Sequence, residues 1–442
     1  MKEPEEALEI AETTRTDSHR VLVFPGGTEI GIEINRSLRF VWNIEIFSAG
    51  SAVSNHAPYV FKNHFNIPSI HEKDWIGRLK EVVCKNEIDF IYPAYDDVLL
   101  ALMEHEDQLQ ARVVASPLET CKVTRFKSST YRLLADIVPT PSIYRSADRV
   151  TEFPIFTKPN RGQGSEGTIK VDNESELKYV TTKFPDHLLT EYLPGDEYTV
   201  DCFTDRELGL LYVGGRRRIR TKNGISYASE HASDDLFLEY AKAISSRLEF
   251  HGAWFYQLKR DRNGSLKLLE VAPRIAGTMA LHRVTGINFP LLSIYEQDRI
   301  PITINPNRFT VRIDRCLSNH YQHDLQYRSV YVDLDDTLVV KENVNTLLVR
   351  FLFQAINSGK QITLLTRAQD NFHERLKKLR IFELFDDIVQ VKPGQEKAEF
   401  IGNPDSIFID DSFRERMSVA EKTGIPTFDC SMVEMLIDEK GF

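Results

Sequence analysis

The sequence lacks the features of a membrane or secreted protein. No apolar run in its 442 residues approaches the roughly 18–20 residues that a membrane-spanning helix needs. The segment MKEPEEALEIAETTRTDSHR at the N-terminus is acidic and has no apolar core, so we expect no secretory signal there. These absences predict a cytoplasmic protein without a membrane partner.

Cysteine is scarce, and an excess of basic charge is missing. The five cysteines show neither a paired framework nor a metal-binding spacing, and we expect them to be buried free thiols; they are Cys84, Cys121, Cys202, Cys316 and Cys430. A formal net charge of −10 argues against a nucleic-acid partner, because a phosphate backbone requires a basic surface. The hydrophobic content of 42% is typical of globular proteins, and the length predicts two or three domains.

Residues 21–115 alternate between strand and helix patterns. The run VLVF is continuously apolar, as in a strand buried on both faces, and strand patterns recur in NIEIFSA and IDFIYPAYDD. Helical spacing in TEIGIEINRSLRF and DWIGRLKEVVCKN separates them. The alternation predicts a parallel sheet covered by helices, preceded by a disordered acidic tail over residues 1–20.

The rest of the chain divides into an α+β part and a second α/β part. Over residues 116–305, TCKVTRFKSSTYRLLAD is predicted to form one helix, and an Arg-Asn-Gly-Ser turn predicts a hairpin in GAWFYQLKRDRNGSLKLLEVAPR. We expect residues 306–327 to form a linker. Over residues 328–442 a new alternation of strands and helices predicts a further parallel-sheet domain.

The stretch FPIFTKPNRGQGSEGTIKV places Lys158 at the end of a strand and a glycine-rich loop after it. Such a loop lets backbone N–H groups approach a phosphate chain, although no Gly-Lys-Ser/Thr closes it. Lys158 and the upstream Lys127 would supply two ammonium groups for a polyphosphate. Taken alone, Lys127 is better explained as a solvated helix lysine, whereas Lys158 fits a functional and a solvated position equally well. The loop residues expected to contact the phosphates are Gly162, Gly164, Ser165 and Gly167.

With TEYLPGDEYTVD, FYQLKR and KLLEVAPR, these segments resemble the ATP-grasp ligases, in particular the carbamoyl-phosphate-synthase-like branch, over roughly residues 21 to 305. The resemblance implies a Rossmann-like leading domain over residues 21–115, an ATP-grasp domain over residues 116–305, and ATP and Mg²⁺ as cofactors. It assigns adenine and ribose contacts to Glu191, Leu193 and Glu197.

The resemblance also assigns the metal and the transferring phosphoryl group. Gln257 and Glu270 would hold magnesium through oxygen atoms, and Arg274 would neutralise the phosphoryl group. The family motif Glu-x-Asn-Pro-Arg has alanine at its third position here, Ala272, so one metal ligand is missing. The basic run over residues 216–220 is compatible with an anionic substrate and equally with a solvated hairpin face.

The motif VYVDLDDTLVV resembles that of the haloacid-dehalogenase (HAD) phosphotransferases. The resemblance makes Asp333 the nucleophile, Asp335 the general acid and Thr366 the hydroxyl that binds the phosphoryl oxygens. Asp333 and Asp335 are also expected at the magnesium site, with Asp410 and Asp411. The catalytic lysine is either Lys397 or Lys392, and Lys397 is favoured because it begins a predicted helix. The segments between these motifs leave no room for a cap insertion.

The predicted protein is therefore a bifunctional enzyme. An ATP-dependent carboxylate–amine ligase, acting through an acyl phosphate on small-molecule carboxylate and amine substrates, is coupled to a magnesium-dependent phosphatase that acts on a phosphorylated metabolite. One alternative is a nucleotide-sensing module, without ligase activity, that regulates the phosphatase. Another is a carboxylase or a ligase with a nucleophile other than an amine. A homodimer is compatible with the sequence.

Overall fold

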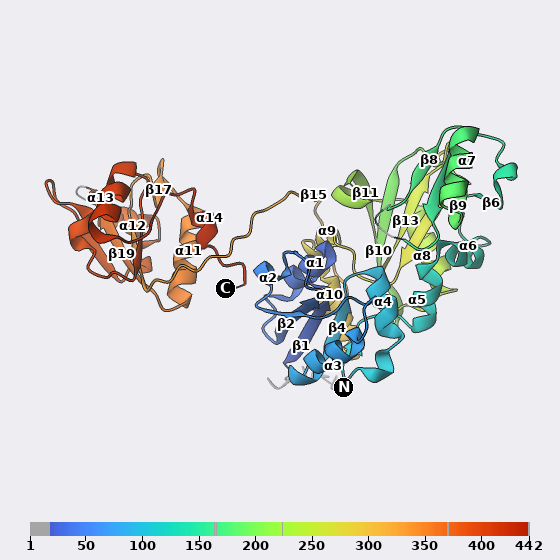
Figure 1. The fold of residues 1–442 in the computed structure, drawn as a ribbon, viewed down its shortest axis with the longest axis horizontal. Helices are drawn as coiled ribbons and strands as arrows, with labels where there is room; N and C mark the ends of the chain where they lie inside the picture. Colours follow the sequence, from blue (N-terminus) through green and yellow to red (C-terminus); the bar gives the residue numbers. More distant parts are fainter. Residues whose placement is uncertain (1–17, 163, 165, 223, 369–370, 441–442) are drawn as a thin grey trace, which may run out of the picture. The chain divides into compact units, whose positions relative to one another are not determined.

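The computed structural model describes residues 18–162, 164, 166–222, 224–368 and 371–440. Between Leu317 and Ser318 the chain divides into two compact units, which are described separately (Figure 1). Within these ranges no helix combines the length and the apolar character needed to span a membrane.

The first unit begins with a five-stranded parallel sheet in the order β3-β2-β1-β4-β5. Its strands are β1 (His19–Phe24), β2 (Ile44–Gly50), β3 (Asn63–Asn66), β4 (Phe90–Pro93) and β5 (Arg112–Val113). Its helices are α1 (Glu29–Leu38), α2 (Ala57–Val60), α3 (Trp75–Lys85) and α4 (Asp96–Met103). Thr28 starts α1 by accepting a hydrogen bond from the Gly31 N–H. The predicted parallel sheet is confirmed.

The segment predicted as a single helix after residue 116 forms two helices, α5 (Leu118–Arg125) and α6 (Lys127–Leu134). Phe126 between them is extended. Asn160 compensates for the break, because its carbonyl accepts from the Lys127 N–H at 3.0 Å and its side chain from the Ser128 N–H at 2.9 Å. The single-helix prediction was wrong, and the break places Lys127 at the first position of α6.

Two antiparallel sheets follow. A four-stranded sheet, in the order β6-β9-β7-β8, contains β6 (Ile143–Tyr144), β7 (Ile155–Pro159), β8 (Ile169–Val171) and β9 (His187–Glu191), with α7 (Glu174–Lys183). A six-stranded sheet, in the order β14-β13-β10-β11-β12-β15, contains β10 (Glu197–Asp205), β11 (Gly209–Lys222), β12 (Ile225–Ala232), β13 (Gly252–Arg260), β14 (Leu266–Ala272) and β15 (Arg312–Asp314), with α8 (Asp235–Ser245). The predicted hairpin joins β13 to β14, and Gly264 has a φ of 82° in its turn.

The parallel sheet and the large antiparallel sheet share one hydrophobic core. Val21 and Tyr92 of the first pack in the same cluster as Phe203 and Phe255 of the second. Helices α9 (Ala280–Arg283) and α10 (Phe289–Gln297) complete this core, and the Tyr92 hydroxyl donates to the carbonyl of Pro290 in α10. This shared core holds the carboxyl end of the parallel sheet against the antiparallel sheet.

The second unit contains a five-stranded parallel sheet in the order β20-β19-β16-β21-β22. Its strands are β16 (Ser329–Val332), β19 (Gln361–Thr366), β20 (Asp387–Gln390), β21 (Ser406–Ile409) and β22 (Thr427–Phe428); β17 (Val339–Val340) and β18 (Asn343–Val344) form a hairpin. Its helices are α11 (Thr346–Asn357), α12 (Phe372–Lys378), the 3₁₀ helix η4 (Lys397–Phe400), α13 (Phe413–Thr423) and α14 (Val433–Leu436). The second predicted parallel sheet is also confirmed.

All five cysteines are free thiols, as expected, but they are not all buried. Cys84 lies on α3 beside the stripe of Trp75, Leu79 and Val83 that faces the core, so its side chain is exposed. Cys316 follows β15 and is also exposed. Cys430 is half-buried, so the expectation of buried thiols is confirmed for Cys121 and Cys202 and was wrong for the other three positions.

Candidate functional site

The first unit holds a cavity of about 250 Å³ that brings together Lys127, Lys158 and Glu270. Lys158 comes from β7, Lys127 from the start of α6 and Glu270 from β14. The Lys127 ammonium donates to the carbonyl of Gly162 at 2.8 Å, which ties it to the glycine-rich loop. Residues separated by more than a hundred positions thus line one cleft, in which Lys127 and Lys158 lie near the carboxylate of Glu270.

Lys158 is the more deeply placed of the two lysines, with 5% of its surface exposed. Its ammonium donates to the hydroxyl of Tyr131 at 2.6 Å and lies over the same ring. Burial, together with the nearby positive charge of Lys127, lowers the pKa of Lys158 to about 7. Burial also lowers the pKa of Lys127, although the charge of Glu270 opposes this shift. Burial in this cavity therefore disfavours the charged forms of Lys127 and Lys158 until an anion binds beside them.

Most of the other predicted nucleotide residues surround the same cavity. It is lined by Gly162, Glu191, Leu193, Glu197 and Gln257 in addition to the three residues above. Gly164 lines the neighbouring cavity, whereas Gly167 lines neither; both have positive φ, of 61° and 70°. Ser165 lies outside the described residues.

Glu197 and Gln257 are engaged by a common arginine. Arg218 donates to the Gln257 side chain at 2.9 Å and forms an ion pair with Glu197. Gln257 on β13 stands opposite Glu270 on β14 in the sheet register, and both residues line the cavity. Their oxygen atoms suit a hard cation.

A second cavity, of about 590 Å³, adjoins the first and shares Glu166, Gln257 and Glu270 with it. Four arginines line it, namely Arg216, Arg218, Arg274 and Arg315. Tyr95 and Thr28 from the parallel sheet's carboxyl end form part of its wall. The second cavity therefore lies where the two sheets meet.

Arg274 lines this second cavity, not the first. It is clamped by Asp96 at the start of α4, with Nε–Oδ1 and Nη2–Oδ2 distances of 2.6 and 2.7 Å. Burial opposes ionisation of Asp96, but the charge of Arg274 outweighs it and lowers the pKa of Asp96. Arg274 is therefore a fixed cation close to Glu270.

Ala272 follows Glu270 by two residues on β14, so both side chains lie on the same face of the strand. Ala272 is 6% exposed and packs in the apolar cluster with Phe255 and Ile275. Its methyl group offers no metal ligand, as expected from the sequence.

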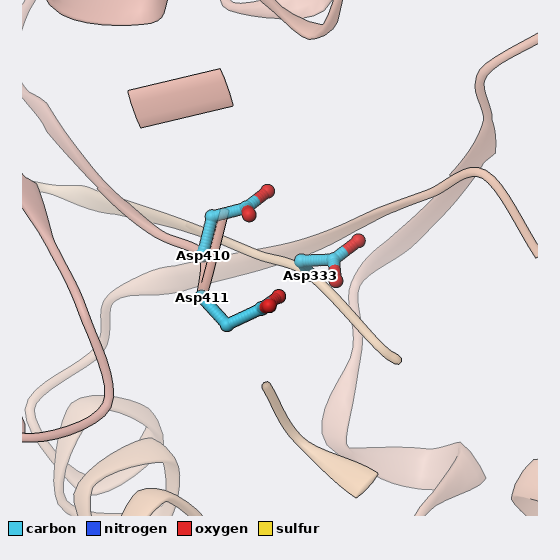
Figure 2. A group of neighbouring side chains, drawn as sticks. All are labelled: Asp333, Asp410 and Asp411. Carbon is cyan, nitrogen blue, oxygen red and sulfur yellow. The ribbon is translucent and has the colours of Figure 1, made fainter. Parts of the chain in front are cut away.

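In the second unit three carboxylates converge at the carboxyl ends of neighbouring strands (Figure 2). Asp333 follows β16, and Asp410 and Asp411 follow β21. Each residue contributes an oxygen that lies within 4.8 Å of the others. Among the described residues, this is the one group of three or more His, Cys, Asp or Glu side chains close enough to hold a metal ion.

Lys397, and not Lys392, reaches these carboxylates. Its Nζ lies 2.5 Å from Asp333 and 2.6 Å from Asp410, whereas Lys392 is exposed. Burial and the charge of Asp410 raise the pKa of Asp333 to about 7 against the opposing effect of Lys397. Burial also raises the pKa of Asp410. One lysine does not compensate three acids, so the donor set and its charge fit a divalent oxygen-binding cation such as Mg²⁺.

The two remaining predicted residues of this unit, Thr366 and Asp335, occupy different surroundings. Thr366 ends β19, is fully buried, and its hydroxyl accepts from the Ala368 N–H at 2.9 Å. Asp335 lies outside the carboxylate cluster and is instead held by Arg375 on α12, with an Nη1–Oδ1 distance of 2.5 Å. The expected direct role of the Asp335 side chain at the metal site is therefore not supported by its position.

Several residues of these sites had not been predicted. Asp96 comes three residues after the buried parallel strand β4, and a position just beyond the carboxyl end of such a strand is a general signal for a site residue. Tyr131 and Arg375 lie on helices with no distinguishing spacing. Arg315 falls in the segment expected to be a linker, but the neighbouring β15 pairs with β12 and brings Arg315 to the second cavity.

Comparisons with known proteins agree with this geometry for the first unit. Residues 183–314 match a family described as "ATP-grasp in the biosynthetic pathway with Ter operon". A D-alanine–D-alanine ligase of Fusobacterium nucleatum subsp. nucleatum is 25% identical over 108 residues, which are 24% of this chain and 38% of the ligase, so the match spans less than half of that relative.

Solved structures extend the likeness. The biotin carboxylase of Campylobacter jejuni, in complex with βγ-ATP, superposes with a TM-score of 0.54 at 15% identity, covering 64% of this chain and 72% of that chain. The L-amino acid ligase of Bacillus licheniformis superposes with a TM-score of 0.53 at 15% identity, covering 64% and 75%. The protein is thus a multidomain α/β protein that contains an ATP-grasp fold.

Proposed function

We propose that the first unit is an ATP-dependent carboxylate–amine ligase and that the second unit is a magnesium-dependent phosphatase of the HAD type. The observation that carries the ligase proposal is the meeting of Lys127, Lys158 and Glu270 in one cavity. The ammonium groups of Lys127 and Lys158 suit a polyphosphate, and the ATP-grasp fold is shared with a biotin carboxylase solved with an ATP ligand.

In the proposed ligase reaction a substrate carboxylate oxygen attacks the γ-phosphorus of ATP, and ADP leaves. The resulting acyl phosphate is attacked at its carbonyl carbon by an amine, which expels phosphate and loses one proton to form the amide. Lys127 and Lys158 would hold the phosphate chain, and Gln257 and Glu270 would hold Mg²⁺, which shields the phosphate charge. Arg274, fixed by Asp96, would stabilise the negative charge that builds up on the transferring group.

In the proposed phosphatase reaction the Asp333 carboxylate attacks the phosphorus of a phosphate monoester. The ester oxygen leaves with a proton from Asp335, and water then hydrolyses the aspartyl phosphate. Asp333, Asp410 and Asp411 would hold Mg²⁺, which offsets the charge of the phosphoryl group. Lys397 would orient Asp333 through their 2.5 Å contact. The observation that carries this proposal is the convergence of these four side chains.

A magnesium-dependent assay of ADP release across libraries of acids and amines tests the ligase. We expect ADP to appear only with a matching acid and Lys158→Met to abolish its release. Lys259→Met is the matched control, because Lys259 lines the same cavity but is partly exposed and paired with Glu197. Equal loss in both variants, or turnover that is unchanged in Lys158→Met, would contradict the assignment.

Hydrolysis of p-nitrophenyl phosphate with Mg²⁺ tests the phosphatase. We expect Asp333→Asn to abolish phosphate release and to leave nucleotide binding intact. Asp336→Asn serves as the control, because Asp336 is exposed and its φ of 58° is tolerated by asparagine. Hydrolysis that persists in Asp333→Asn would remove the basis for the second activity.

Ala272 favours one alternative, a module that binds the nucleotide but does not catalyse the ligase reaction. The buried methyl group at this position withdraws a ligand from the proposed metal site. A sensor would bind ADP and ATP with similar affinity and release no ADP with any acid and amine. Its nucleotide occupancy would instead change the rate at which the second unit hydrolyses phosphate esters.

A further inference from the structure

The second cavity contains one arginine without a counter-ion. Arg216 is paired with Asp201 at 2.6 Å, Arg274 with Asp96 at 2.6 Å, and Arg218 with Glu197. No ion pair joins the fourth guanidinium, that of Arg315, to any carboxylate in the described part of the chain. Its side chain donates to the carbonyl of Gly277, a neutral partner.

Burying the Arg315 guanidinium beside a neutral partner costs free energy. Burial lowers the pKa of Arg315; the charges of Glu33 and Glu29 oppose this shift only in part, and those of Arg216 and Arg36 add to it. Arg218, which lines the same cavity, has an Nε that is buried without a hydrogen-bond partner. A guanidinium without an ion pair in the described part of the chain and an unpartnered Nε, both on residues that line one cavity, indicate that an anion completes it.

Arg315 and Arg274 mark different parts of this cavity. Arg274 interacts with Asp96 and Glu270, which lies beside the two lysines of the first cavity. Arg315 interacts with Glu33 and Glu29 of α1, and Glu29 also interacts with Arg274. The two arginines nevertheless follow β14 and β15, which are the opposite edge strands of the six-stranded sheet. A carboxylate that reacts with the γ-phosphoryl group would lie near Arg274, so it would leave Arg315 without a partner.

We propose that the acid substrate of the ligase is a dianion, whose second anionic group, a carboxylate or a phosphate ester, is bound by Arg315. Arg315 is then the residue that determines specificity for this class of acids. The inference rests on the proposed ligase function, because that function places the reacting carboxylate near Arg274. A cavity of about 590 Å³ accommodates a small acid of this kind.

Two properties of the chain support a dedicated position for this arginine. The backbone N–H of Arg315 donates to the Tyr227 carbonyl at 2.9 Å, which continues the pairing of β15 with β12. Gly277 leaves space for the guanidinium, since a Cβ at this position would lie 2.8 Å from Nη2 of Arg315. Both features hold the charged end of the side chain at the cavity.

Calorimetric titration of the full chain in the presence of Mg²⁺–ADP tests the proposal with matched probes. 3-Phosphoglycerate is compared with glycerate, and succinate with butyrate, so that each dianion differs from its partner by one anionic group. We expect at least one dianion to bind about tenfold or more tightly than its monoanion. The phosphate and carboxylate pairs show which second group Arg315 accepts.

Arg315→Gln is expected to remove this preference, which means about a tenfold weaker affinity for the dianion and unchanged affinity for the monoanion. Arg312→Gln is the matched control, because Arg312 begins β15, three residues before Arg315, is exposed and pairs with Glu230 outside the cavity. Gly277→Ala displaces the guanidinium without removing its charge and is expected to weaken dianion binding as well.

The outcomes separate this proposal from the proposed ligase function. Mg²⁺–ADP binding is measured first, and its absence would refute the nucleotide assignment. If ADP binds but no dianion is preferred, or if Arg315→Gln retains the preference, the dianion proposal is overturned while the nucleotide site stands.

Discussion

The low pKa of Lys158 predicts that nucleotide binding takes up protons. In the free protein its pKa is about 7, so at pH 8 about 90% of Lys158 is neutral. A polyphosphate beside the ammonium favours the charged form and returns the pKa towards its usual range near 10. Binding at pH 8 is therefore expected to take up about 0.9 proton through Lys158.

The sign of the pH dependence follows from the same shift. Below pH 7 Lys158 is already charged, so little uptake occurs. Above pH 7 each unit of pH weakens nucleotide affinity about tenfold, until the pKa of the complex is reached. The terminal phosphate of ADP is ionised above pH 7 and contributes little to this change.

Calorimetry of Mg²⁺–ADP binding at pH 8, in buffers of low and high ionisation enthalpy, measures the uptake directly. Lys158→Arg keeps a charge that does not titrate and should remove most of the buffer dependence. Lys259→Arg, in the wall of the same cavity, should retain it. A binding enthalpy that is equal in both buffers, with an affinity that stays flat from pH 7 to 9, would refute the reasoning.

Two further predictions concern stability. Lys397→Met leaves buried acids unpaired and should lower the free energy of unfolding at pH 8 by ~3–5 kcal/mol in urea titrations, with a smaller loss at pH 5, where Asp333 is protonated. Lys392→Met should change the free energy of unfolding little, and equal effects of the two substitutions would contradict the placement of Lys397. Asn160→Ala and Asn173→Ala should each cost about 1 kcal/mol, because both side chains accept from the first turn of a helix. Only Asn160→Ala should also weaken ADP binding, since that helix start holds Lys127, and an unchanged ADP affinity would count against the link.

Local patterns in the sequence were sufficient to predict individual strands and turns. Continuous apolar runs such as residues 21–24 predicted buried parallel strands, and the Arg-Asn-Gly-Ser turn predicted the β13–β14 hairpin, because strand burial and tight turns depend on neighbouring residues. The break at Phe126 was missed, since the groups that satisfy it belong to Asn160, in a different part of the chain.

The candidate sites likewise combine residues that the sequence predicted with residues that only the fold brought into place. Residue type and order were enough to single out Lys127, Lys158, Glu270 and the acids after the strands of the second unit. The tertiary structure alone decided that Arg315 leaves the expected linker for a cavity wall and that Lys397, not Lys392, meets Asp333. Burial and the distance between charges are properties of the folded chain, and a one-dimensional pattern contains neither.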